Sequence, residues 1–334
     1  MNRADATSPQ QGLAPRCVVF GEALVDAFPD AQVPGGAPFN VACHLAGLGL
    51  LPLFVSRVGH ADSGAALLRR QAQRLGLDFS AVQVDATHGT GRVTVVECDA
   101  GHSFEIESDQ AYDHVELAPA LQQVAAYAGG STPWLYFGTL ALRSARSRAT
   151  LQGLRAALRG PTFVDFNWRD AGPPWPLALE AVAGVSVLKV SAEELLAILA
   201  QLGLPDADTA RPAQAGEQRG AILALMSALR LDHLLVTCGA EGASLWSADG
   251  RCMVHAPAAA VPVLRDTVGA GDAFSARALA GFMSGAPVEQ MMRGATAFAS
   301  ALCGVRGALP DGVDFYRPWQ AGRREQEVAQ HVDA

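Results

Sequence analysis

Lysine is almost absent from this sequence: Lys189 is the only one, and every other Lys/Arg position is arginine. The sequence therefore lacks two motifs that need a lysine at a fixed position. These are the G-x-x-x-x-G-K-[ST] phosphate loop and the V-A-I-K strand of protein kinases. Basic charge is also scarce, because 25 Lys+Arg residues against 33 Asp+Glu residues leave a net charge of −8. We expect no nucleic-acid partner, and any bound anion must be held by local groups.

Paired cysteines and long hydrophobic runs are lacking as well. The six cysteines lie far apart with no C-x-x-C, and the eight histidines include no H-E-x-x-H. This pattern argues against a disulfide framework and indicates reduced thiols. No run approaches the roughly 18 apolar residues of a membrane span, and the N-terminal residues lack the order of a secretory signal. We therefore expect a cytoplasmic protein that does not enter a membrane.

What the sequence does contain is enough apolar material for a large packed core. Hydrophobic residues make up 50% of 334 residues, and charged residues only 17%. At this size a folded chain buries about three quarters of its surface. Polar tails at 1–15 and 321–334, the first of them expected to be flexible, leave a predicted folded unit at 16–320.

Predicted strands alternate with predicted helices along this unit. Short apolar runs predict strands at 17–21, 51–59, 133–138, 162–167, 185–191 and 233–239. Helical spacing of apolar residues, with proline or glycine at the ends, predicts helices at 38–47, 61–76, 144–159, 176–183, 192–202, 217–230 and 270–284. Such alternation is typical of an α/β fold with a mainly parallel sheet flanked by helices. The alternating stretch at 82–106 predicts a hairpin in a separate small sheet.

The most informative segment is RDTVGAGDAFSARALAGF at 265–282. Gly269, Ala270 and Gly271 precede an apolar helix, whose first N–H groups lack partners within the helix and can bind one anion. Asp272 beside them makes sense as a base that takes a proton from a hydroxyl while those amides hold a phosphoryl group. An acidic residue favoured by the helix dipole is the alternative.

A second segment, VPGGAPFN at 33–40, places paired glycines before another helix start. Asn40 could donate to and accept from sugar hydroxyls, and Asp26 could accept from others. A structural turn followed by a capping amide would have the same sequence.

Together these segments indicate a family. The order GEALVD, PGGAPFNVACHLAGLG, RVGHADSG, VDFNWR, LKVSAEEL, VTCGAEGA and DTVGAGDAF resembles the ribokinase-like (phosphofructokinase-B type) carbohydrate kinases, nearest the fructokinase and 2-dehydro-3-deoxygluconokinase branch. The resemblance implies a Rossmann-like sheet with a small β-sheet lid from about 22–34 and 90–108. It also implies a catalytic base at Asp272, an anion hole at 269–271, and sugar-binding positions, namely Asp26, Gly35, Gly36 and Asn40.

Further residues match the family's other motifs. Asn167 and Arg169 fall near the expected sugar and transferred phosphate, unless they form only a strand-end turn with a solvated arginine. Ser191 and Glu194 form an S-x-x-E version of a motif that orders Mg²⁺, with Glu193 one residue away; both glutamates are also good first-turn helix residues. The nucleotide side is implied to include Lys189 and three residues of a turn that could also be a plain β-turn, namely Thr237, Gly239 and Gly242.

The expected function is transfer of the γ-phosphoryl group of ATP to a hydroxyl of a small sugar, with fructose favoured. Glu107 and Ser108 stand where this branch commonly carries an aromatic and an arginine, which favours a neutral sugar. The alternatives are a 2-dehydro-3-deoxygluconokinase, a nucleoside kinase, or a non-catalytic sugar or nucleotide sensor. A nicotinamide enzyme is excluded because no G-x-G-x-x-G follows the first strand. The family implies Mg²⁺, a monovalent cation such as K⁺, and a homodimer through the lid.

Overall fold

The computed structural model describes residues 16–98, 101–205 and 217–320, so the two polar tails predicted from the sequence lie outside the described residues. The strands are β1 (Cys17–Phe20), β2 (Leu24–Ala27), β3 (Gln32–Gly35), β4 (Leu53–Val55), β5 (Arg57–Gly59), β6 (Gln83–Asp85), β7 (Gly91–Cys98), β8 (Gly101–Ile106), β9 (Trp134–Gly138), β10 (Thr162–Asp165), β11 (Val187–Ser191), β12 (His233–Thr237), β13 (Ala243–Ser247) and β14 (Cys252–Ala256). The α-helices are α1 (Ala37–Gly47), α2 (Ser63–Leu75), α3 (Leu117–Ala128), α4 (Ala145–Leu158), α5 (Trp175–Val182), α6 (Ala192–Gln201), α7 (Glu217–Leu229), α8 (Ala270–Ser284) and α9 (Val288–Leu302). Short 3₁₀ helices are η1 (Ala111–His114), η2 (Leu140–Arg143), η3 (Gly239–Glu241) and η4 (Val313–Trp319).

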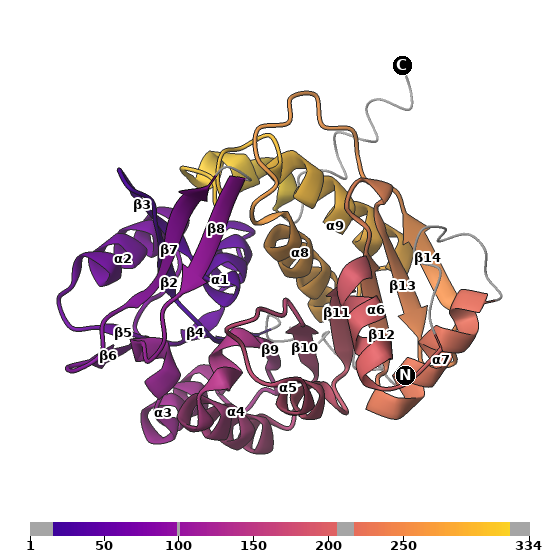
Figure 1. Cartoon of the computed structure of the whole chain (residues 1–334), viewed down its shortest axis with the longest axis horizontal. Coiled ribbons are helices and arrows are strands. Elements are labelled where there is room, and N and C mark those ends of the chain that lie inside the picture. The colour runs from indigo at the N-terminus through magenta and orange to yellow at the C-terminus, as the bar shows by residue number, and fades with distance from the viewer. Residues whose placement is uncertain (1–15, 99–100, 206–216, 321–334) are drawn as a thin grey trace, which may run out of the picture.

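The main sheet has eight strands in the order β14-β13-β12-β11-β10-β9-β1-β4. Strands β4 through β12 in this order are parallel, and β13 and β14 add to one edge in antiparallel fashion. Buried residues of α3 to α7 cover one face, and those of α1, α2, α8 and α9 cover the other (Figure 1). The predicted mainly parallel α/β fold is confirmed.

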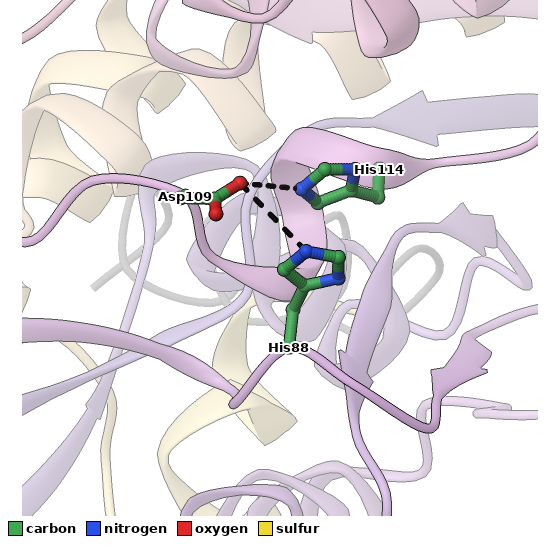
Figure 2. A group of neighbouring side chains, drawn as sticks. All are labelled: His88, Asp109 and His114. Atoms are coloured by element: carbon green, nitrogen blue, oxygen red, sulfur yellow. Dashed lines mark hydrogen bonds and ion pairs between the residues drawn. The ribbon is translucent and has the colours of Figure 1, made fainter.

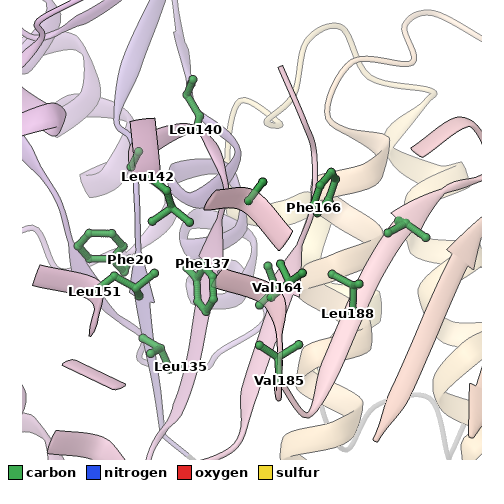
Figure 3. Packing of buried hydrophobic residues seen from close by; sticks show 14 of the residues in the cluster. Phe20, Leu135, Phe137, Leu140, Leu142, Leu151, Val164, Phe166, Val185 and Leu188 are labelled. Carbon is green, nitrogen blue, oxygen red and sulfur yellow. The ribbon is translucent and has the colours of Figure 1, made fainter. Parts of the chain in front are cut away.

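The inner strands are apolar on both faces. In β1, Val18 and Phe20 pack in the cluster with α3 to α7, whereas Cys17 and Val19 pack in the cluster with α1 and α8. Figure 3 shows the first of these clusters, in which Phe137 and Val164 of the neighbouring strands lie close to Phe20 and Leu188. A parallel strand covered by helices on both sides needs no polar alternation, which is why CVVF is a continuous apolar run.

A separate sheet of four strands, in the order β3-β2-β7-β8, lies to one side of the main sheet (Figure 1). The chain leaves β1 through Gly21, whose φ of 150° suits glycine, and enters β2. Strand β2 pairs antiparallel with β3 and parallel with β7. Two stretches about 60 residues apart in the sequence therefore form one small sheet.

Some elements differ from the sequence-based expectation. The apolar run 51–59 is not one strand: it breaks at Ser56 into β4 in the main sheet and β5, which pairs with β6 in a two-stranded sheet. Helices α3 and α9 were not predicted. Helix α3 is rich in alanine, whose small side chain marks a buried face only weakly, whereas α9 buries Met291, Phe298 and Leu302 at helical spacing and could have been predicted from this pattern.

Candidate active site

Two helix N-termini from opposite parts of the sequence meet beside the small sheet. Helices α1 and α8 pack against each other, and both start at a glycine. In their first turns the Asn40 side-chain amide donates a hydrogen bond of 2.8 Å from Nδ2 to Oδ2 of Asp272. The two segments singled out in the sequence are therefore joined directly.

Both starting glycines are required by backbone geometry. Gly36 has a φ of 102°, and a Cβ there would lie 2.7 Å from the Glu22 carbonyl oxygen. Gly269 has a φ of 78°, and a Cβ there would lie 2.5 Å from Ala308 Cα. Since both φ values are unfavourable for L side chains, only glycine lets the chain turn into these helices here. The neighbouring Gly35 is also tight, because a Cβ there would lie 2.8 Å from Oδ2 of Asp26.

The carboxyl group of Asp272 is tuned to exchange a proton near neutral pH. Burial raises its pKa to about 7, the Asn40 hydrogen bond lowers it, and the nearby Asp165 carboxylate raises it again. Lys189 and Arg169 partly offset these effects. A group with this pKa is ionised for a large part of the time at neutral pH and still binds a proton readily, which suits a general base.

The amides around Asp272 divide into two kinds. The Ala270 N–H donates to the Thr267 carbonyl at 3.2 Å, and the Ala273 N–H donates to the Gly269 carbonyl at 2.9 Å. The Gly271 and Asp272 amides lie between them at the helix start, where α-helices leave N–H groups without helical partners. Within the predicted anion hole at 269–271, Gly271 is thus placed better than Ala270 to hold an anion, and the Asp272 amide, which the prediction did not include, is placed like that of Gly271.

Asp26 and Arg169 act on this same region. Burial raises the pKa of Asp26, on β2 of the small sheet, to about 6, and the positive charge of Arg169 lowers it in part. Arg169 follows β10 and is exposed. One guanidinium therefore acts on the carboxyl groups of Asp26, on strand β2, and Asp272, on helix α8.

Glu22 is a member of this group that the sequence analysis did not assign. It is 3% exposed, and burial raises its pKa to about 7. Asp272 raises this pKa further and Arg169 lowers it. Glu22 Oε2 and Asn40 Oδ1 are both buried without a hydrogen-bond partner among the described residues. The available signal was an ionisable residue directly after an apolar strand, in GEALVD.

Lys189, the only lysine of the sequence, is buried close to the first turn of α8. Lys189 Nζ lies 3.0 and 3.2 Å from the two carboxylate oxygens of Asp165, and Ser275 donates to Asp165 at 2.8 Å. Burial alone would lower the lysine pKa, but Asp165 and Glu194 raise it overall. A Cβ on Gly271 would lie 3.3 Å from Lys189 Nζ, so the ammonium approaches the start of α8.

Ser191 and Glu194 form a capping box at the start of α6. The Ser191 hydroxyl accepts from the Glu194 N–H at 3.2 Å, and the Glu194 carboxylate accepts from the N–H groups of Ser191 and Trp168, both at 2.8 Å. Glu194 thereby also holds the turn after β10, where Asn167 has a φ of 38°. Glu193 is exposed, whereas burial and Asp165 raise the pKa of Glu194.

These groups also fit a divalent cation. Asp165, Glu194 and Asp272 are close enough that Asp165 raises the pKa of both others. Lys189 is the buried cation among them. Carboxylate oxygens are the ligands that Mg²⁺ prefers. Both oxygens of the buried Asp165 already contact Lys189, so the partly exposed Glu194 is the side chain suited to bind Mg²⁺ through water.

A cavity of about 670 Å³ adjoins the start of α8. It brings together all three residues of the predicted nucleotide turn, Thr237, Gly239 and Gly242, with Ala270 and Gly271. Much of the remaining lining is small or apolar, such as Ala258, Val261, Leu264, Phe274 and Ala299. An apolar cavity that ends at a helix N-terminus can hold a flat ring in one part and an anionic group in the other.

Over the described part of the chain, no helix is long and apolar enough to cross a membrane. Comparison with known proteins shows the family. A model of the pfkB family of carbohydrate kinases matches residues 11–313. A fructokinase of Klebsiella pneumoniae is 30% identical over 321 residues, covering 90% of this chain and 97% of that protein. An aminoimidazole riboside kinase of Salmonella typhimurium is 30% identical over 271 residues, 77% of each chain. The crystal structure of an ATP-bound fructokinase from Xylella fastidiosa has the same fold, with a TM-score of 0.78 at 22% identity, covering 94% of this chain and 100% of that one. This chain therefore belongs to the pfkB family of carbohydrate kinases.

Proposed function

We propose that this protein is an ATP-dependent sugar kinase that phosphorylates a hydroxyl of a small neutral sugar, with fructose as the first candidate. The observation that carries the proposal is the Asn40 to Asp272 hydrogen bond of 2.8 Å, at a helix N-terminus that also borders the 670 Å³ cavity. This bond holds a carboxyl group with a pKa of about 7 at a helix start, where free N–H groups can bind an anion. The relatives named fructokinase support the sugar assignment.

In this mechanism Asp272 takes the proton of the sugar hydroxyl as the oxygen bonds to the γ-phosphorus of ATP. The bond from that phosphorus to the oxygen bridging to the β-phosphate breaks, and ADP leaves with the electron pair. The amides of Gly271 and Asp272 stabilise the charge on the transferred group, and Arg169 adds a positive charge from the strand β10 side. Asn40 keeps the Asp272 carboxyl in place.

The nucleotide would lie in the cavity, with its ring between the turn at Thr237 to Gly242 and the residues of α9, and its phosphates towards Gly271. Lys189 would contribute a buried positive charge there. Mg²⁺ would be held through water by Glu194, and when bound it would neutralise phosphate charge. A monovalent cation such as K⁺ fits the loop at Asp266, whose carboxylate accepts from the N–H groups of Val268 and Gly307.

The sugar would lie between the small sheet, acting as a lid, and the start of α1. Asp26, Asn40 and the backbone at Gly35 and Gly36 would bind its hydroxyls, and Asn167 lines the adjoining turn. The unpartnered oxygens of Glu22 and Asn40 support a polar ligand. Arg92 is paired with Glu107 at 3.3 Å, so its charge is partly neutralised before any acidic sugar could bind it.

The direct test is release of ADP by purified protein with ATP, Mg²⁺ and one acceptor at a time. The acceptors are fructose, ribose, 2-dehydro-3-deoxygluconate, fructose 1-phosphate and adenosine. We expect the highest kcat/KM with fructose. A higher kcat/KM with 2-dehydro-3-deoxygluconate or with adenosine would identify a 2-dehydro-3-deoxygluconokinase or a nucleoside kinase instead. Binding of sugar or nucleotide without turnover of any acceptor would identify a non-catalytic sensor.

Replacing the base tests the mechanism. Asp272→Asn should lower kcat by about 10²–10⁴-fold, because a general base acts in the transition state, while sugar affinity changes less than about tenfold. Asp232→Asn, at an exposed position next to β12, is the matched control and should keep full activity. Turnover of Asp272→Asn equal to the unmodified enzyme would rule out the proposed base.

We also propose that the lid pairs in a cytoplasmic homodimer. The strand order of the lid sheet, β3-β2-β7-β8, leaves β3 and β8 as edge strands. Unpaired edge strands favour pairing with another chain. Light scattering on the purified protein should give twice 34.8 kDa. A monomeric mass at all concentrations up to 100 µM would argue against this assembly.

A further inference from the structure

Three side chains with metal-binding atoms meet outside the candidate active site, at the base of the lid. His88 lies in the loop before β7, Asp109 follows β8, and His114 ends η1. Figure 2 shows the two imidazole rings side by side with the Asp109 carboxylate directed at both. The ring centroids are 3.7 Å apart at an interplanar angle of 15°, and one ligand atom from each residue lies within 4.8 Å of the others.

The carboxylate contacts a nitrogen of each ring. Asp109 Oδ1 is 2.8 Å from Nε2 of His114 and 3.8 Å from Nε2 of His88. The contact to His114 is a hydrogen bond, and the contact to His88 is longer. One oxygen therefore already lies between two nitrogens that could bind the same ion.

A second layer orients the His88 ring. Its Nδ1 lies 3.1 Å from Oδ2 of Asp85 and 3.0 Å from the Thr87 hydroxyl, which itself donates to Oδ1 of Asp85 at 2.9 Å. Both partners of Nδ1 are thus acceptors, which puts the proton on Nδ1 and the lone pair on Nε2, facing Asp109. A carboxylate behind the far nitrogen is the usual support of a metal-binding histidine.

Asp85 is itself firmly held. Its side chain is 2% exposed and lies 2.8 Å from Nε of Arg57. Burial alone would raise its pKa, but hydrogen bonds from the amides of His88 and Thr87 hold that pKa well below the usual range. The support behind His88 is therefore fixed by contacts with Arg57 and with the backbone.

We propose that His88, Asp109 and His114 bind a divalent transition-metal ion of the zinc type. Two imidazole nitrogens and one carboxylate oxygen are a common zinc ligand set, with water as the fourth ligand. For the metal to bind, the proton that His114 Nε2 now donates to Asp109 moves through solvent to Nδ1, and the freed Nε2 lone pair binds the ion. The Asp109 side chain is 73% exposed, which leaves it free to rotate towards the ion.

The position gives the ion a defined role. His88 precedes β7 and Asp109 follows β8, so the ion would bridge both ends of the lid hairpin and tie them to η1. Arg143 already links this region by donating to the Asp113 carboxylate and to the Glu107 carbonyl, at 2.7 to 2.9 Å. We therefore expect the metal to stabilise the lid base rather than to take part in phosphoryl transfer.

Calorimetric titration of the metal-free, untagged protein with zinc chloride tests this, in buffer with excess Mg²⁺ to occupy the nucleotide region. We expect one zinc per chain with a Kd of about 10 µM or tighter, and a higher melting temperature with zinc. His88→Gln and His114→Gln should each weaken binding at least 30-fold. His255→Gln, an exposed histidine on β14, is the matched control and should bind as the unmodified protein does.

Two results would overturn the proposal. Equal zinc binding by the variants and the control would place the ion elsewhere, and no binding up to 100 µM would leave the three residues as a hydrogen-bonded cluster only. Because a variant could fail to fold, each is checked by circular dichroism. A crystal of the unmodified protein soaked with zinc should in addition show anomalous scattering between the three side chains, and a peak at other ligands would contradict the site.

Discussion

Residues distant in sequence tune each other's protonation in the candidate site. The carboxyl groups of the buried Glu22 and the partly exposed Asp272 both have a pKa raised to about 7. The charge of Asp272 disfavours ionisation of Glu22, and Arg169 offsets part of this repulsion. Such paired, shifted groups are more frequent at functional sites than elsewhere in a protein. Their coupling makes the activity depend on pH in a predictable direction.

We predict that kcat/KM for the sugar falls as the pH drops below about 7, because Asp272 must be ionised to accept a proton. Glu22→Gln removes a negative charge near Asp272 and should lower the Asp272 pKa. The fall of kcat/KM at acidic pH, the acidic limb of the profile, should therefore move down by about half a pH unit. Measurement of kcat/KM from pH 5 to pH 9 checks both statements. Glu180→Gln, exposed on α5, should leave the limb in place. A limb that stays in place in Glu22→Gln would mean that the two groups are not coupled.

The cluster at the lid base also consists of residues that are distant in sequence. His88, Asp109 and His114 are ordinary polar residues in the sequence, and no metal motif connects them. They meet because β7 and β8 pair antiparallel, which brings the loop before β7 close to the loop after β8. Strand pairing therefore created a set of ligands that sequence spacing did not indicate.

At the scale of the element, the start of α8 combines structural and chemical demands. Gly269 has a positive φ, and a Cβ there would have backbone atoms of Ala308 within 3 Å. Gly285 at the other end of α8 also has a positive φ, but a Cβ there would meet open space. Comparing alanine substitutions at these two glycines therefore distinguishes the free-energy cost of a positive φ from the cost of a steric clash.

Gly269→Ala should lower the free energy of unfolding by about 3 kcal/mol or more, because it combines the left-handed penalty with a backbone clash. Gly285→Ala carries the conformational penalty alone and should cost about 1 kcal/mol. Urea denaturation of both variants measures the difference. Equal losses would show that the approach of Ala308 does not constrain the turn.

At the scale of the whole molecule, the proposed sugar site is divided between two sheets. Asp26 belongs to the four-stranded sheet, and Asn40 and Asp272 belong to helices that pack on the main sheet. A sugar bound to all three would connect the two sheets and exclude water from the phosphoryl group.

We predict that Asp26→Asn raises KM for the sugar about tenfold or more and changes kcat much less, because this side chain would bind the sugar without accepting its proton. In this variant the rise in melting temperature caused by the sugar should become smaller, while the rise caused by ATP should stay unchanged. Asp30→Asn, in the exposed turn between β2 and β3, is the control. A loss of kcat with unchanged KM in Asp26→Asn would assign it a different role.

Much of the chemistry was determined by the sequence alone. Gly269 to Asp272 and Gly35 to Asn40 imply a turn into a helix by local backbone rules, and the apolar runs between them imply a buried parallel sheet. These are properties of a few neighbouring residues, so no knowledge of distant contacts is needed to predict them.

The tertiary structure decided everything that depends on residues far apart in the chain. Only folding brings Asn40 to 2.8 Å from Asp272, raises the pKa of Glu22 by burying it, and stacks His88 on His114. It also broke the apolar run 51–59 into strands of two sheets. The physical reason is that burial, electrostatic coupling and strand pairing are set by the distances between atoms, and sequence separation does not specify these distances.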